Sequence, residues 1–165
     1  MNKYIIDNTE FKLLVTGICR EISADDWRPD YIVGITRGGL LPALMISQWF
    51  DIPMQSLDVS LRDNNVCVSN LGMAEDAYEG KNILIVDDIN DTGATLNWIM
   101  QDWPGGCHPS AIRWPDVWNK NVRFATVVDN LSSKFNAIVD YVGMEVNKAE
   151  KDVWIEFPYE EWWTK

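Results

Sequence analysis

The chain has 165 residues, 47% of them hydrophobic, which suits one domain with its own apolar core. Its net charge of −11 argues against nonspecific binding to nucleic acid, which depends on lysine and arginine at the phosphates. No stretch approaches the roughly 20 apolar residues of a membrane helix, and the first residues lack the apolar core of a secretory signal. Three scattered cysteines favour a reduced, cytoplasmic setting, and a single histidine argues against zinc.

The N-terminal half predicts two helices and two strands. The first helix, capped by Asn8 or Thr9, would bury one apolar face made of Phe11, Leu14, Val15, Ile18 and Ile22. A buried strand (Tyr31–Thr36), a helix (Leu40–Phe50) and a further strand (Met54–Ser60) follow. Residues 61–80 are polar and weakly periodic, which predicts a mobile loop or a small hairpin.

The C-terminal half continues the alternation of strands and helices. A strand over Asn82–Asp88 leads into a helix with Leu96, Ile99, Met100 and Trp103 on one face, which Pro104 and two glycines should end. Further strands are predicted over Val122–Val128 and Tyr141–Val146. Apolar strands that alternate with helices favour an α/β fold with a parallel sheet covered on both faces.

Two of these strands end in residues suited to one ligand, because ligands of open α/β sheets bind at the carboxyl ends of the strands. After Thr36, the paired glycines of "RGG" let backbone amides approach an anion, and Arg37 adds a charge-assisted donor. An ordinary strand-to-helix turn with a surface arginine is the alternative for this segment.

The second strand end is "ILIVDDINDTGATL", residues 83–96. Thr92–Thr95 stand where a helix begins and would cradle a phosphate, whereas three aspartates just upstream would repel one. The carboxylates suit ribose hydroxyls or Mg²⁺ instead. Phosphoribosyl pyrophosphate (PRPP) has this layout: a phosphate, ribose hydroxyls and a second anionic group that takes Mg²⁺.

Residues 83–96 resemble the PRPP-binding motif of the type I phosphoribosyltransferases, and "IVGITRGGLLPA" resembles their pyrophosphate loop. The likeness extends to "VDYVGMEVNKAEKDVWIEFPYE" and is nearest to the bacterial xanthine–guanine (6-oxopurine) branch. It implies one domain over 1–165: a mainly parallel central sheet flanked by helices, with a small hood formed by the C-terminal segment. Residues 61–80 would be a mobile loop and 101–121 an insertion.

The resemblance assigns roles residue by residue. Arg37, Gly38 and Gly39 would bind the pyrophosphate, with a non-proline cis peptide expected at Thr36–Arg37. Asp87 and Asp88 would hold the ribose hydroxyls and Mg²⁺, Asp88 being the nearer to the metal. Asp91 would face purine N7 as acid or base. The 5′-phosphate would lie on Thr92, Gly93, Ala94 and Thr95. Trp154 would stack on the base and the main chain of Ile155 would read its exocyclic group.

One departure from the family pattern concerns the base. The 6-oxopurine enzymes carry a lysine after the fourth core strand that donates to purine O6, and Asn130 stands about there in this chain. An asparagine amide can donate to a carbonyl or present its oxygen to an amino group. Lys134 is a second candidate if its loop folds back.

The resemblance therefore implies Mg²⁺-dependent transfer of phosphoribosyl from PRPP to a purine in a cytoplasmic homodimer or homotetramer, with Asp91 and Arg37 as catalytic residues. No nucleic acid or membrane partner is implied. Arg62 would reach the pyrophosphate from the mobile loop. Two alternatives stay open: transfer to another nucleobase, and a non-catalytic PRPP or nucleotide-binding regulator on the same fold.

Overall fold

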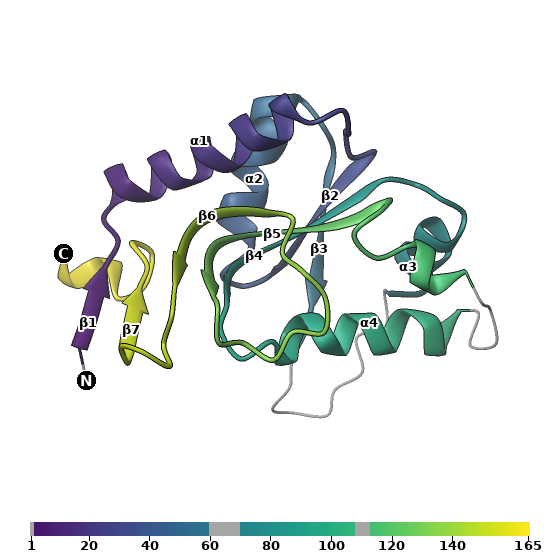
Figure 1. Ribbon diagram of the computed structural model, residues 1–165. Coiled ribbons are helices and arrows are strands. Elements are labelled where there is room, and N and C mark those ends of the chain that lie inside the picture. The colour runs from purple at the N-terminus through teal and green to yellow at the C-terminus, as the bar shows by residue number, and fades with distance from the viewer. Residues whose placement is uncertain (1, 60–69, 108–112) are drawn as a thin grey trace.

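The computed structural model describes residues 2–59, 70–107 and 113–165 (Figure 1). Its elements, in chain order, are β1 (Asn2–Ile5), α1 (Asn8–Ala24), β2 (Tyr31–Thr36), α2 (Leu40–Phe50), β3 (Met54–Asp58), α3 (Asn70–Tyr78), β4 (Ile83–Asn90), α4 (Ala94–Gly106), β5 (Val122–Asn130), β6 (Tyr141–Val146) and β7 (Val153–Glu156). Short 3-10 helices η1 and η2 cover Trp114–Asp116 and Trp162–Thr164. Among the described residues, no helix is long and apolar enough to cross a membrane.

The predicted α/β fold is confirmed. Five parallel strands form the central sheet in the order β3-β2-β4-β5-β6. Helices α1 and α2 cover one face, and α3 and α4 cover the other (Figure 1). Strand β4 serves both layers, because its side chains alternate between the faces: Leu84 and Val86 belong to the core under α1 and α2, and Ile83 and Ile85 to the core under α3 and α4.

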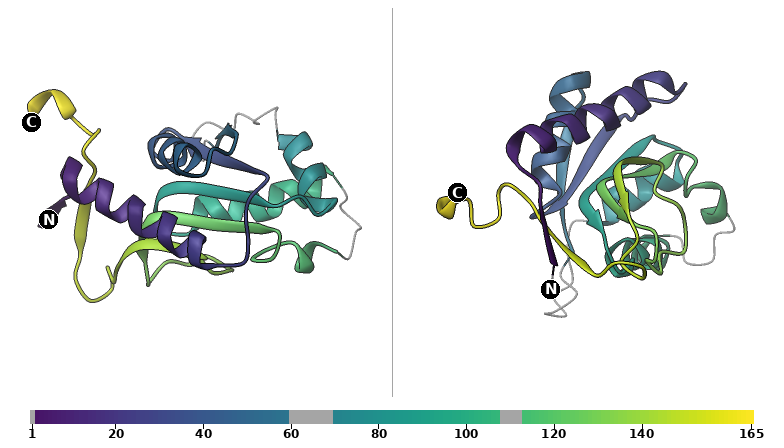
Figure 2. Two further views of the ribbon diagram at one scale, coloured as in Figure 1. Left: turned by 90° about the horizontal axis from the view of Figure 1, so that it is seen from above. Right: turned by 60° about the vertical axis from the view of Figure 1, so that its left-hand side comes forward.

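The C-terminal segment forms the predicted hood, together with the N-terminal strand. Strand β7 pairs in parallel with β1, and this two-stranded sheet is separate from the main one. In Figure 2 the segment that ends in η2 extends away from the main sheet, beside the N-terminus. The C-terminal segment reaches the ends of β2 and β4 through Tyr159, whose hydroxyl contacts Gly38 and Asp88.

The order of the strands locates the site. The chain leaves β2 for its outer neighbour β3 and then returns to the other side of β2 as β4. The connections that follow β2 and β4 therefore diverge, with α2 on one face and α4 on the other (Figure 1). A crevice opens at such a switch point, outside the carboxyl ends of the two strands.

Two local predictions were wrong, and a third was right only in part. The cap of α1 is Asp7, whose side chain accepts from the amide of Glu10, rather than Asn8 or Thr9. Residues 70–78, expected in a loop or hairpin, form α3, which buries Met73 among the core residues. The two glycines predicted to end α4 do so, since the helix ends at Gly106, but it continues through Pro104, which was expected to help stop it.

The segment predicted as an insertion over 101–121 contributes to the core. Its described part includes Trp103, Trp114 and Trp118, which pack in one cluster with Phe124 of β5. The rings of Trp114 and Trp118 stack at 5.6 Å, and those of Trp118 and Phe124 at 6.0 Å. These tryptophans therefore belong to the layer under α3 and α4.

Candidate active site

The loop after β2 brings glycine backbone against the end of β4. The peptide between Thr36 and Arg37 is cis, as expected. The Gly39 amide donates to the Ile35 carbonyl at 2.8 Å, and a β-carbon on Gly39 would overlap the Val86 carbonyl oxygen. Gly39 therefore lets the two strand ends pack closely, and its N–H is already engaged inside the protein.

Gly38 lies directly against the acidic pair. A β-carbon at this position would overlap the Asp88 carboxylate, so the absence of a side chain brings the loop backbone and the carboxylate together. Arg37, next to it, is exposed. The two halves of the predicted PRPP site thus meet in the structure, with Gly38 on one side and Asp88 on the other.

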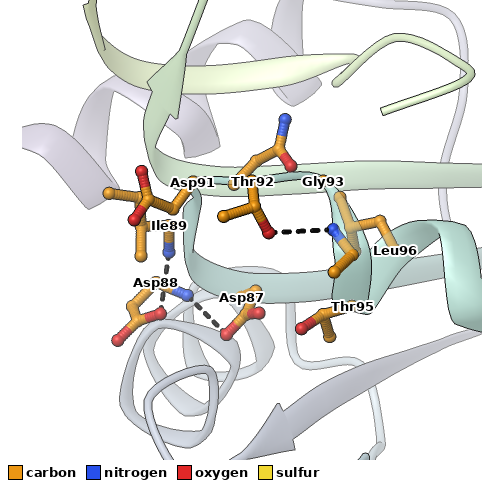
Figure 3. Close-up of a pocket in the computed structure, with 10 residues that line it drawn as sticks. Asp87, Asp88, Ile89, Asp91, Thr92, Gly93, Thr95 and Leu96 are labelled. Atoms are coloured by element: carbon orange, nitrogen blue, oxygen red, sulfur yellow. Dashed lines mark hydrogen bonds between the residues drawn. The ribbon is translucent and has the colours of Figure 1, made fainter. Parts of the chain in front are cut away.

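Asp87 and Asp88 differ in their surroundings (Figure 3). The Asp88 amide donates to Asp87 Oδ1 at 2.9 Å, and the Ile89 amide donates to Asp88 Oδ1 at 2.8 Å. Asp87 is buried, and this burial together with the charge of Asp88 raises its pKa well above the usual range. A cation or a set of ligand hydroxyls beside Asp87 would relieve this unfavourable burial of charge.

Tyr159 is a site residue that the sequence did not single out. Its hydroxyl donates to Asp88 Oδ2 at 2.8 Å and lies 3.2 Å from the Gly38 carbonyl oxygen. The ring is fixed by Phe157, stacked at 5.6 Å, and by Phe11 edge-on at 6.0 Å. Burial and the charge of Asp88 raise the pKa of Tyr159 far above its ordinary value, so the hydroxyl remains a donor.

A cavity lies at the turn after β4, where the sequence predicts a phosphate cradle. Residues 87–96 enclose a cavity of about 220 Å³ in front of the first turn of α4 (Figure 3). Gly93 caps this helix with φ of 90°, and a side chain there would overlap the amide of Phe135. Thr92 Oγ1 accepts from the Ala94 amide at 3.2 Å. The helix terminus therefore presents amide and hydroxyl groups and a positive dipole end to this cavity.

Asp91 is paired with a lysine that the sequence did not indicate. Lys148 Nζ lies 2.9 Å from Asp91 Oδ1. Asn130 does not point freely toward a base, because its Nδ2 donates to the Asp91 carbonyl at 2.9 Å and its Oδ1 accepts from the Lys148 amide at 3.0 Å. The main-chain amide of Lys134 donates to the Thr92 carbonyl at 2.8 Å, which places the loop of Lys134 beside the turn before α4.

The aromatic end of the site lies in the hood. Trp154 on β7 is 47% exposed, which leaves its ring available to a ligand. Ile155 is buried and pairs with Tyr4 of β1, so only its main chain could face a ligand. A second cavity, of about 860 Å³, is lined by Arg37, Gly38, Asp88, Trp154, Tyr159 and the C-terminal residues 160–163. Arg62, predicted to reach the pyrophosphate, lies outside the described residues.

Fold and site thus define an α/β protein with a cavity and an acidic pair at the switch point of its parallel sheet. A family model for the phosphoribosyl transferase domain matches residues 1–161. A xanthine-guanine phosphoribosyltransferase of Cereibacter sphaeroides is 31% identical over 141 residues, which cover 81% of this chain and 70% of that protein. The chain belongs to the phosphoribosyltransferase family.

Other relatives agree with this assignment. The xanthine phosphoribosyltransferase 1 of Saccharomyces cerevisiae is 32% identical over 123 residues, covering 60% of this chain and 58% of that protein. Among solved structures, a purine phosphoribosyltransferase from Pyrococcus horikoshii superposes with a TM-score of 0.71 at 23% identity, covering 98% of this chain and 96% of that one. At this identity the superposition supports the fold.

Proposed function

We propose that this chain transfers the phosphoribosyl group of PRPP to N9 of a 6-oxopurine, releasing pyrophosphate, in purine salvage. The observation that carries the proposal is the meeting of Gly38 with the Asp88 carboxylate, which sets an anion-binding loop beside an acidic pair and opposite a phosphate cradle. The named relatives, which are xanthine-guanine and xanthine phosphoribosyltransferases, support the choice of base.

Each part of the site has a separate task in the reaction. Thr92–Thr95 at the start of α4 bind the 5′-phosphate, and Asp87 and Asp88 hold the ribose hydroxyls. Arg37 and the Gly38 backbone bind the pyrophosphate. As the bond from the ribose C1′ to the pyrophosphate oxygen breaks, Arg37 stabilises the charge on the leaving group, and the carboxylates face the cationic sugar ring.

The base completes the reaction at the other side of the ribose. Trp154 stacks on the purine, and the main chain of Ile155 contacts its exocyclic group. Purine N9 forms the new bond to C1′, and Asp91 accepts the proton that leaves N7. All atoms are accounted for: PRPP and the base become the nucleotide, pyrophosphate and one proton.

The acidic pair suits Mg²⁺. The residues that the structure describes contain no group of three or more acidic, cysteine or histidine side chains able to cage a metal. Mg²⁺ commonly uses only one or two carboxylates and takes its other ligands from phosphates and water. Asp88, with Asp87, would hold the ion, and the raised pKa of Asp87 marks a position where a cation relieves charge repulsion. When bound, Mg²⁺ neutralises the developing charge on pyrophosphate.

The test is pyrophosphate release from PRPP and Mg²⁺ with guanine, xanthine, hypoxanthine, adenine, uracil and orotate. We expect release with the 6-oxopurines. Asp91→Asn should lower kcat by about a hundredfold or more while the KM for PRPP changes little, and the exposed Asp26→Asn is the matched control. Equal losses in kcat and PRPP affinity would contradict the acid–base role. No release with any base would favour a nucleotide-binding regulator.

We further propose that the protein works as a cytoplasmic homodimer or homotetramer. Cys19 and Cys107 are free cysteines, which agrees with a reducing compartment. Trp162 and Trp163 are 68% and 70% exposed in the hood, so within one chain they do not pack in the core. Light scattering of the purified protein tests the oligomeric state.

A further inference from the structure

The loop between β5 and β6 lies against the turn that precedes α4. The Lys134 amide donates to the Thr92 carbonyl at 2.8 Å. A β-carbon on Gly93 would overlap the amide nitrogen of Phe135, so the two backbones are in close contact. The ring of Phe135 packs edge-on against Phe124 of β5, with 5.1 Å between the ring centroids. The loop is therefore anchored on the sheet and supports the turn from one side.

Asn97, in the first turn of α4, joins the helix to this loop. Its Nδ2 donates to the Lys134 carbonyl at 2.9 Å, and its Oδ1 accepts from the Asn136 amide at 2.8 Å. Its own amide donates to the Gly93 carbonyl at 3.0 Å, inside the turn. Asparagine is a poor helix former, and this one uses both side-chain groups outside the helix. One half-buried side chain therefore holds the loop on both sides of Phe135.

The composition of the adjacent cavity makes the conformation of this turn important. Residues 87–96, which line the cavity, include three aspartates and no lysine or arginine (Figure 3). Among these residues, a phosphate can be bound only by main-chain N–H groups and threonine hydroxyls. Such N–H groups bind an anion when they converge on it, and the three carboxylates repel it. Phosphate binding at this cavity therefore depends on how closely the turn keeps its conformation.

We propose that Asn97 is a positioning residue for the 5′-phosphate. Its two side-chain bonds hold the β5–β6 loop against the turn, and the loop holds the turn through the bond from Lys134 to Thr92. The amides of residues 93–95 thereby keep the arrangement in which they meet the phosphate. Asn97 itself lies behind the turn and is not among the residues that line the cavity.

This inference rests on the phosphate-binding part of the proposed function, and ligand binding tests it apart from turnover. Asn97→Ala should weaken binding of inosine 5′-monophosphate about tenfold, the effect of losing two neutral hydrogen bonds. Pyrophosphate with Mg²⁺, which binds at the Arg37 end of the site, should change less than about threefold. In turnover, the KM for PRPP should rise about tenfold while kcat changes less than about threefold.

Asn121→Ala is the matched control. The Nδ2 of Asn121 also donates to two main-chain carbonyls, those of Ala77 and Lys81, each at 2.8 Å. Asn121 immediately precedes β5, at the end of the strand opposite the site. This variant should therefore have a lower melting temperature and unchanged binding of both ligands.

Calorimetric titration of both ligands and the melting temperature of each variant decide the matter. Equal weakening of the two ligands in Asn97→Ala, or a lower melting temperature with full nucleotide binding, would make Asn97 only a structural residue and overturn the inference. Asn97→Ser, whose side chain is too short for either partner, repeats the test if Asn97→Ala does not fold.

The two proposals fail in different ways. If the wild type forms nucleotides and Asn97→Ala binds inosine 5′-monophosphate as tightly, this inference fails and the proposed function stands. If the wild type releases no pyrophosphate with any base, but Asn97→Ala selectively loses nucleotide binding, the proposed transfer fails and the role of Asn97 stands. A wild type that binds no inosine 5′-monophosphate would overturn both.

Discussion

Replacing Tyr159 with phenylalanine removes one hydroxyl from the junction between the pyrophosphate loop and the acidic pair and leaves the ring in place. The hydroxyl lies 2.8 Å from Asp88 Oδ2 and 3.2 Å from the Gly38 carbonyl oxygen. The contacts of the ring with Phe11 and Phe157 do not involve the hydroxyl and should persist. The substitution therefore changes the orientation of Asp88 more than the packing of the hood.

The magnitude follows from the kind of bond lost. A hydrogen bond to a charged group contributes about 1.5 to 3 kcal/mol, or about ten- to a hundredfold in affinity if the bond supports ligand binding. In Tyr159→Phe the Ile89 amide still donates to Asp88 Oδ1, so we expect a loss at the lower end of this energy range. We expect the KM for PRPP at limiting Mg²⁺ to rise about tenfold, and the free energy of unfolding to fall by about 1 kcal/mol.

The assay is initial-rate pyrophosphate release over a matrix of PRPP and Mg²⁺ concentrations, with urea unfolding on the same preparations. Tyr4→Phe is the matched control, because the Tyr4 hydroxyl also donates to a carboxylate, that of Glu10, but lies outside the site. A KM for PRPP in Tyr159→Phe within twofold of the wild type would refute the positioning of Asp88 by Tyr159. So would a comparable rise in Tyr4→Phe.

Periodicity predicted the main sheet well, because its central strands β2, β4 and β5 are buried on both faces. Strand β4 has four apolar residues in sequence, and β2 and β6 begin and end where predicted. Strand β1 escaped prediction because its four residues are exposed and it gains its strand partner from β7, about 150 residues away. Helix α3 has no such distant dependence, but its nine residues are too few for a clear helical period.

The site residues also fall into two groups: those that a local motif indicates and those that only the folded chain brings to the site. Residues 37–39 and 87–95 are contiguous motifs, and their local turn chemistry is enough to indicate a phosphate half and a carboxylate half. Tyr159 and Lys148 reach the site only through tertiary packing, and the resemblance of their segment to the family assigned neither of them a role. Asn130 shows the limit of sequence reasoning most clearly. Its place near the site was predicted, but its hydrogen bonds were not: its amide bonds to the main chain of Asp91 and Lys148 and is not free to contact a base.

Two further changes test the packing and the electrostatics of the fold. Gly39→Ala should lower the free energy of unfolding by about 1 to 3 kcal/mol in urea titrations, because the new carbon would overlap the Val86 carbonyl oxygen; Gly17→Ala, in open space on α1, should be neutral or stabilising. Burial raises the pKa of Tyr141 from about 10 when unfolded to about 12. The folded state therefore keeps a proton that the unfolded state loses, so the contribution of Tyr141 to stability is full below pH 10 and falls by about 2 to 3 kcal/mol as the pH rises toward 12. Burial also raises the pKa of Cys19 from 9.0 to about 11, so the contribution of Cys19 declines earlier, from pH 9 upward. In Tyr141→Phe the free energy of unfolding should therefore fall less between pH 10 and pH 12 than in the wild type. An equal fall in both proteins would refute the attribution of this pH dependence to Tyr141.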